Sequence, residues 1–109
     1  MRIISQNGMA DYPYERCMIF VNYKERTKLC ISMCGDVGYG DLAEYDSEED
    51  AKFALQYFSA MYCDGIKLCE ALSAKTMSEL RTAFLAGREK NENVAQFIKR
   101  KATELSGRR

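Results

Sequence analysis

One helix limits what this chain can fold into more than any other segment. It is predicted over residues 47–64, where Ser47 can cap the helix and three acidic residues follow at the positive end of the helix dipole. Apolar side chains then recur at helical spacing and form one continuous stripe: Ala51, Ala54, Leu55, Phe58, Met61 and Tyr62. Gly65 stands where a glycine commonly ends a helix. Because water would otherwise contact the whole stripe, the helix must pack on another element, and the segments before it offer the face of a sheet.

Four segments before the helix have the composition and length of strands. They are residues 2–5, 17–23, 29–34 and 42–45. The second of these is apolar on both faces, so we expect a central strand that is covered on each side. Five polar residues join it to the third segment, which predicts a hairpin. The fold class is therefore predicted to be α+β, with a small antiparallel sheet of about four strands and one helix packed on it.

The chain changes character after Gly65. Residues 66–72 fit either a last strand or a short helix. A capping box from Thr76 to Glu79 opens one further helix, and the spacing of Val94, Phe97, Ile98, Ala102 and Leu105 indicates another. We predict an αβ domain over residues 1–72. Residues 73–109 would then form a C-terminal helical hairpin that packs on this domain or pairs between two copies.

The distribution of charge divides the chain at about the same place. Residues 1–64 contain 11 acidic and 6 basic residues, whereas residues 65–109 contain 5 acidic and 10 basic residues. No apolar run approaches the roughly 20 residues that cross a bilayer, so we expect no membrane partner. The first residues have no apolar signal-peptide core, and we expect a cytoplasmic protein.

The five cysteines raise the question of a metal or redox site. Only Cys30 and Cys34 have the close spacing of structural zinc ligands, and the chain has no histidine. Their segment alternates apolar and small residues as a strand does, which would place the two thiols about 13–14 Å apart. Two ligands of one zinc ion lie much closer together than that. We therefore expect free thiols, no metal and no cofactor.

The residues that could carry catalysis are few. Without histidine, a general base would have to be a carboxylate, lysine, tyrosine or cysteine with a shifted pKa. The acidic cluster at residues 46–50 is explained by the start of the helix. Tyr12, Tyr14 and Tyr45, with Asp11 and Glu15, could either line a pocket or pack at a hairpin edge. We predict no catalytic residues and no enzymatic activity.

Binding functions are the remaining classes. Seven tyrosines, five phenylalanines and six methionines supply more adaptable contact surface than a core of this size needs, which favours a protein-interaction module. Its partner would be a host protein or a second copy of the chain, and pairing of the C-terminal helices would give a homodimer. The alternative is nucleic-acid binding by the basic end of the last helix. The candidate interaction residues are Tyr12, Tyr14, Tyr45, Lys99, Arg100, Lys101, Arg108 and Arg109.

Two stretches of the sequence also resemble a known family. Residues 1–8 read MRIISQNG, and residues 43–52 read AEYDSEEDAK directly before the aromatic part of the helix. They resemble a family of small proteins of uncharacterised function from Gram-positive gut bacteria, their phages and mobile elements. Its members begin M-R-I-I-S-Q-[DN]-G and carry A-E-Y-x-[ST]-E-E-x-A-K. The similarity covers about residues 1–72, and the last 37 residues do not match the family's usual ending. The resemblance implies no activity, only the context of an accessory gene that is often borne by a phage or mobile element. In that context the acidic N-terminal half could mimic a nucleic-acid surface and inhibit a host defence.

Overall fold

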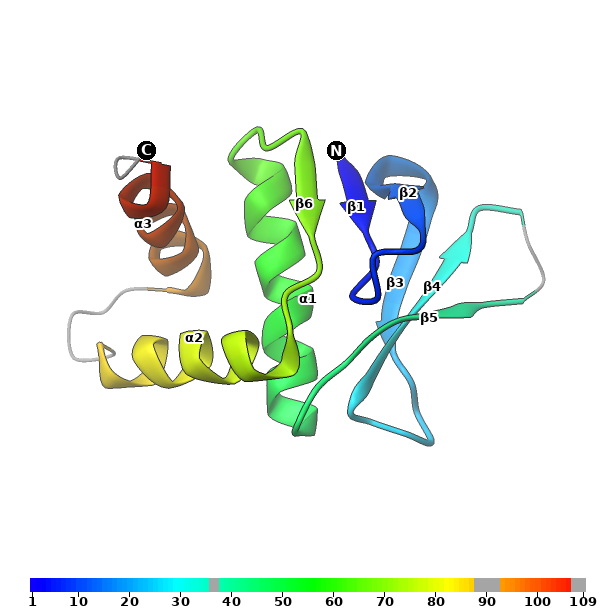
Figure 1. Ribbon diagram of the computed structural model, residues 1–109, viewed down its shortest axis with the longest axis horizontal. Coiled ribbons are helices and arrows are strands. Elements are labelled where there is room, and N and C mark those ends of the chain that lie inside the picture. Colours follow the sequence, from blue (N-terminus) through cyan, green and yellow to red (C-terminus); the bar gives the residue numbers. More distant parts are fainter. Residues whose placement is uncertain (36–37, 88–92, 107–109) are drawn as a thin grey trace.

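The computed structural model describes residues 1–35, 38–87 and 93–106, with side chains as far as residue 101. The fold is α+β, as predicted, and has two three-stranded sheets and three helices (Figure 1). The helices are α1 (Glu48–Cys63), α2 (Ala74–Ala86) and α3 (Val94–Ser106). Helix α1 lies in the middle of the molecule, with the sheets on one side and the other two helices on the opposite side (Figure 1).

The first sheet has the strand order β2–β1–β6 and joins distant parts of the chain. Its strands are β1 (Arg2–Ile4), β2 (Asp11–Pro13) and β6 (Leu68–Glu70). Strand β1 pairs antiparallel with β2 and parallel with β6, so that Ile3 lies opposite both Tyr12 and Cys69. The segment that the sequence left undecided, residues 66–72, therefore contains a strand.

The second sheet is an antiparallel meander with the strand order β3–β4–β5. Its strands are β3 (Cys17–Val21), β4 (Lys28–Met33) and β5 (Gly40–Glu44), and a 3-10 turn, η1 (Tyr14–Arg16), leads into the first of them. The predicted β3–β4 hairpin is present, with Ile19 opposite Ile31. The register shifts between Leu29 and Cys30, where Leu42 is an extra residue on β5, so β5 carries a bulge.

Two sequence predictions about the sheets are corrected by this arrangement. The strands do not form one antiparallel sheet of about four strands, because β6 adds to β1 in a separate, mixed sheet. Strand β3 is also not a central strand, because it pairs only with β4 and lies at an edge. Apolar residues on both faces of a strand indicate that both faces are covered. They do not determine whether the strand has a neighbouring strand on each side.

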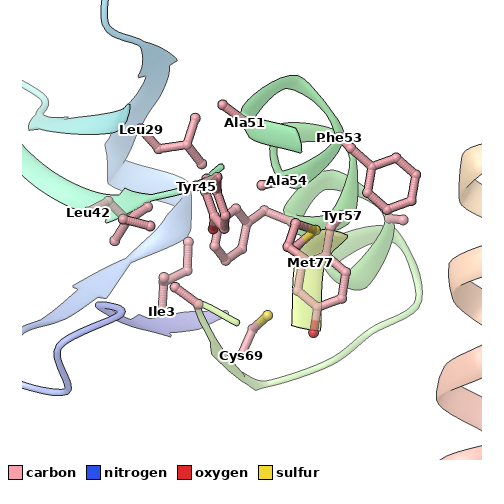
Figure 2. Close-up of a cluster of buried hydrophobic side chains, with 14 of the residues drawn as sticks. Ile3, Leu29, Leu42, Tyr45, Ala51, Phe53, Ala54, Tyr57, Cys69 and Met77 are labelled. Carbon is pink, nitrogen blue, oxygen red and sulfur yellow. The ribbon is translucent and has the colours of Figure 1, made fainter. Parts of the chain in front are cut away.

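Helix α1 begins and ends as predicted. The Ser47 side chain accepts a hydrogen bond of 3.1 Å from the Asp50 amide, and Gly65 follows with a φ of +78°. The predicted stripe is buried only in part: Ala51, Ala54 and Phe58 are buried, Leu55 and Met61 are half-buried, and Tyr62 is exposed. A second face, which the sequence reading missed, is also buried: Phe53, Tyr57 and Ala60. Figure 2 shows the core between the strands and this helix, with Tyr45 and Met77 among the buried side chains.

The two C-terminal helices pack on the second face of α1. Phe53 of α1 contacts Phe84 of α2 with ring centres 5.7 Å apart, and Phe84 contacts Phe97 of α3 at 5.4 Å. The carboxylate of Asp50, which is 3% exposed, binds the Arg81 guanidinium of α2 at 2.7 Å. In Figure 1 helices α2 and α3 run in different directions, and each packs mainly on α1, so they do not lie side by side as the predicted hairpin would. Within the described part of the chain, no helix is long and apolar enough to cross a membrane.

The start of α2 differs from the predicted capping box at Thr76. Ser73 caps this helix instead, and its hydroxyl accepts a hydrogen bond from the Thr76 amide at 3.2 Å. The serine lies three residues earlier than predicted, so the helix gains one more turn at its N-terminus. Thr76 is therefore the residue whose amide is bound by the capping side chain, and it is not itself the N-cap.

The N-terminal segment MRIISQNG has a structural role. Gly8 adopts a φ of +75° in the turn between β1 and β2, and Asn7 Oδ1 accepts a hydrogen bond from the Met9 amide. The Gln6 side chain donates to the carbonyls of Glu44 (2.9 Å) and Leu72 (3.0 Å), and accepts from the Glu44 amide (2.9 Å). Gln6 therefore ties the first turn to β5 and to the segment before α2.

Candidate functional site

An open cleft lies between η1, β3 and α1. Its volume is about 370 Å³. We refer to this space as the cleft. It is lined by aromatic, aliphatic, thiol and acidic side chains: Tyr14, Glu15, Cys17, Ile19, Leu55, Phe58 and Tyr62. The rings of Tyr14 and Tyr62 close one end with their centres 4.9 Å apart, and Tyr62 remains 44% exposed. The cleft can therefore accept an apolar or aromatic side chain from outside the molecule.

The titratable groups of the cleft are held in unreactive forms. Burial raises the pKa of the Tyr14 hydroxyl, although a hydrogen bond with Ser59 opposes the shift. Burial also raises the pKa of the Cys17 thiol, so this cysteine is a poor nucleophile at neutral pH. The hydrogen bond from the N-terminal ammonium lowers the pKa of Glu15, which keeps that carboxylate charged and unsuited to act as a general base near neutral pH. The cleft is thus suited to binding.

Beside the cleft, β3 presents backbone groups that pair with nothing in the described chain. The backbone N–H of Asn22 donates to the Lys28 carbonyl (2.9 Å), and the backbone N–H of Cys34 donates to the Arg16 carbonyl (2.8 Å). These two bonds show which residues of β3 direct their peptide groups toward β4 and which direct them away. Even-numbered residues of β3 therefore bond to β4, and the odd-numbered ones direct their peptide groups away from the sheet. We call the outward groups of Cys17, Ile19 and Val21 the β3 edge. The Cys17 N–H already donates to the Tyr14 carbonyl, so the part of the edge that is open for pairing is at Ile19 and Val21.

The other edges of the two sheets are protected, whereas the β3 edge is not. Gln6 covers β5, since its amide donates to the Leu42 carbonyl at 3.0 Å and its side chain binds Glu44. Strand β2 is three residues long, ends in Pro13 and carries Asp11, which pairs with Arg2. Strand β6 also has only three residues and carries a glutamate. Strand β3 has five residues with no charge, no proline and no bulge. Such an edge is a template for another strand.

The three tyrosines predicted as interaction residues lie in different environments. Tyr14 lines the cleft, and Tyr12 is half-buried on β2 opposite Ile3. Tyr45 is 4% exposed in the core, so the prediction that it contacts a partner is wrong. Its ring packs among Leu29 and other core side chains (Figure 2), and its hydroxyl finds no hydrogen-bond partner among the described residues.

The basic residues predicted at the end of the last helix are engaged within the molecule as far as they are described. Lys99 Nζ lies 3.9 Å from Asp64 Oδ1. Arg100 and Lys101 lie over the Phe97 ring, at 5.4 and 5.8 Å from its centre. Arg108 and Arg109 lie outside the described residues. A nucleic-acid surface on this helix stays a prediction.

The cysteines are dispersed through the fold. Cys30 and Cys69 are buried, Cys34 and Cys63 are exposed, and Cys17 is half-buried in the cleft. Among the described residues, no three acidic or cysteine side chains converge on a point that could hold a metal ion.

The sequence did not identify the cleft or the β3 edge; of the cleft residues, it singled out only Tyr14 and Glu15, as residues that could line a pocket. The available signal was the uncharged segment CMIFVNY, which was assigned to the inside of a sheet. Comparisons with protein-family models, with curated proteins and with solved structures find no significant match. The geometry of the cleft and the β3 edge is therefore the basis on which a function is inferred.

Proposed function

We propose that this protein is a non-enzymatic binding module that takes up an extended segment of another polypeptide along the β3 edge. The observation that carries this proposal is that the outward peptide groups of Ile19 and Val21 have no partner in the described chain, at the side of a sheet whose other edge is covered by Gln6. A strand added to β3 would satisfy the outward peptide groups of Ile19 and Val21. Each such hydrogen bond contributes roughly 0.5–1.5 kcal/mol.

The position of the cleft supports the same function. Side chains of an added strand alternate between the two faces of the sheet, so every second one would lie on the side of α1. On that side the cleft offers the half-buried Leu55 and the exposed Tyr62 as contacts. Backbone pairing would supply affinity, and the cleft would supply selectivity for the side chain that enters it.

The biological setting follows from the resemblance of the N-terminal motif to proteins of phages and mobile elements. In that setting the bound polypeptide is a host protein or a second copy of the chain. Nucleic-acid binding is the competing function, and it has a distinct signature. Affinity for DNA or RNA would fall steeply with added salt, whereas apolar strand addition would change little.

Amide hydrogen exchange tests the proposal directly. The amides of Ile19 and Val21 should exchange rapidly in dilute protein, and should become protected when an occupant is present. The occupant is supplied as a panel of uncharged, β-branched heptapeptides or as concentrated protein. Free exchange of both amides under every condition would refute strand addition.

A matched pair of variants strengthens the test. Met18→Lys places a charge on the outer face of β3, where Met18 is 63% exposed, and should weaken binding at least tenfold. Met9→Lys makes the same change in the β1–β2 turn, where Met9 is 85% exposed, and should leave binding unchanged. Equal binding by the two variants would contradict a site at β3.

A further inference from the structure

We propose that the strand added to β3 is the β3 strand of a second copy, antiparallel and related by a two-fold axis at Ile19. This inference rests on the proposed function and names the occupant of the same edge. The resulting sheet would have six strands in the order β5–β4–β3–β3–β4–β5. Strand β3 would then be central, which is the position that its apolar sequence predicts.

The register follows from the direction of the backbone groups. Only odd-numbered residues of β3 point outward, so an added strand must pair with them. Ile19 is the middle residue of the strand, and an axis there gives full overlap. Ile19 then faces its own copy, and Cys17 faces Val21 of the second molecule. No charged residue occurs from Cys17 to Tyr23, so the two strands meet without repulsion.

In the same register, the side chains on the outer faces of the two β3 strands are complementary to each other. Met18, which is 63% exposed, would lie opposite Phe20 of the second copy, and this contact occurs twice about the axis. Phe20 already packs edge-on against Tyr39 with ring centres 5.4 Å apart. A methionine thioether beside an aromatic ring is a favourable contact of about 0.3–1.5 kcal/mol. Pairing would therefore cover apolar surface that is exposed in the single chain.

The second copy would also contribute side chains to the cleft. Tyr23 follows Val21 at the next odd position and is 73% exposed in the single chain. In the antiparallel register its counterpart extends past Cys17 toward Tyr14, so the cleft would receive another aromatic ring. Lys24 comes next and would bring an ammonium group toward the exposed carboxylate of Glu15. This complementarity of ring and charge favours a second copy over an unrelated peptide.

The oligomeric state is the first test. Light scattering after size exclusion, from micromolar to near-millimolar protein, should show a dimer whose dissociation constant rises at least tenfold in Met18→Lys and is unchanged in Met9→Lys. A dimer in which Ile19 and Val21 amides still exchange freely would overturn the proposal, because another surface would then hold the copies together.

A disulfide tests the register. In one chain Cys17 and residue 21 lie about 13 Å apart along a strand, too far for a disulfide. Across the proposed axis their Cα atoms would lie about 5.5 Å apart. Val21→Cys should therefore form an intermolecular disulfide with Cys17, as oxidised glutathione accepts the two electrons and two thiol protons. Peptide mapping should find this bond, and Val21→Cys with Cys17→Ser should lack it. Its absence in a dimer would refute the register.

The outcomes separate this inference from the proposed function. A protein that stays monomeric, yet shows protected Ile19 and Val21 amides with added peptides, would refute the second copy and retain strand addition. A monomer with unprotected amides under all conditions would refute both. A concentration-dependent dimer with the mapped disulfide supports both.

Discussion

Replacement of Gln6 by alanine should destabilise the fold strongly for a residue in a surface turn. The change removes three side-chain hydrogen bonds, two with Glu44 and one with the Leu72 carbonyl. At roughly 0.5–1.5 kcal/mol for each, the free energy of unfolding should fall by about 2–4 kcal/mol. Since small domains are stable by only about 5–15 kcal/mol, this loss is a large fraction of the total.

Urea unfolding followed by circular dichroism measures this effect. With a slope of about 1–3 kcal/mol per molar urea, the midpoint should fall by roughly 1–2 M. Gln56→Ala is the matched control, because Gln56 is exposed on α1 and its side chain has no hydrogen bond to a described residue. This control should stay within about 0.5 kcal/mol of the parent. Equal midpoints for the two variants at one protein concentration would show that Gln6 does not join the sheets.

Three further predictions concern the core. Burial raises the pKa of the Cys69 thiol from 9.0 to about 11, so its stabilising contribution is complete below pH 9 and is lost as the pH rises through 11. The parent should therefore lose about 2–3 kcal/mol more than Cys69→Ala between pH 8 and 11, by urea unfolding. Ellman's reagent should modify Cys34 and Cys63 rapidly, and should reach Cys30 and Cys69 only after unfolding. Prompt labelling of all thiols would show that Cys30 and Cys69 are not buried. Phe97→Ala should lower the unfolding free energy by about 3–5 kcal/mol, because this ring is 1% exposed between α1 and α2; an unchanged melting temperature would show that α3 is not docked.

The parts of the fold that sequence could predict are those determined by neighbouring residues. Helix α1 was predicted with its cap because Ser47 and Gly65 act within one turn of the ends that they define. The β3–β4 hairpin was predicted for the same reason. The second buried face of α1 was missed because Phe53 packs against Phe84, which lies far along the chain.

The parts that sequence could not predict depend on distant partners. Residues 66–72 were ambiguous because the strand that stabilises them is β1, at the other end of the αβ unit. Tyr45 was named as a candidate interaction residue, yet its ring lies in the core just before α1, among side chains from distant parts of the chain. Of the candidate site, Tyr14 and Glu15 were named as residues that could line a pocket or pack at a hairpin edge, whereas Leu55 and Tyr62 were assigned only to the helix stripe.

The parallel pairing of β1 with β6 has a consequence for biosynthesis. Strand β1 leaves the ribosome first, but its neighbour Leu68–Glu70 follows 66 residues later, and at about 5–20 residues per second that delay is roughly 3–13 s. The β3–β4–β5 meander and α1 are made in between and can form from local contacts alone. Until β6 is made, Ile3 and Ile4 therefore remain exposed on a nascent chain whose other parts have begun to fold. That interval, more than any property of the finished molecule, is when this protein would most benefit from a chaperone.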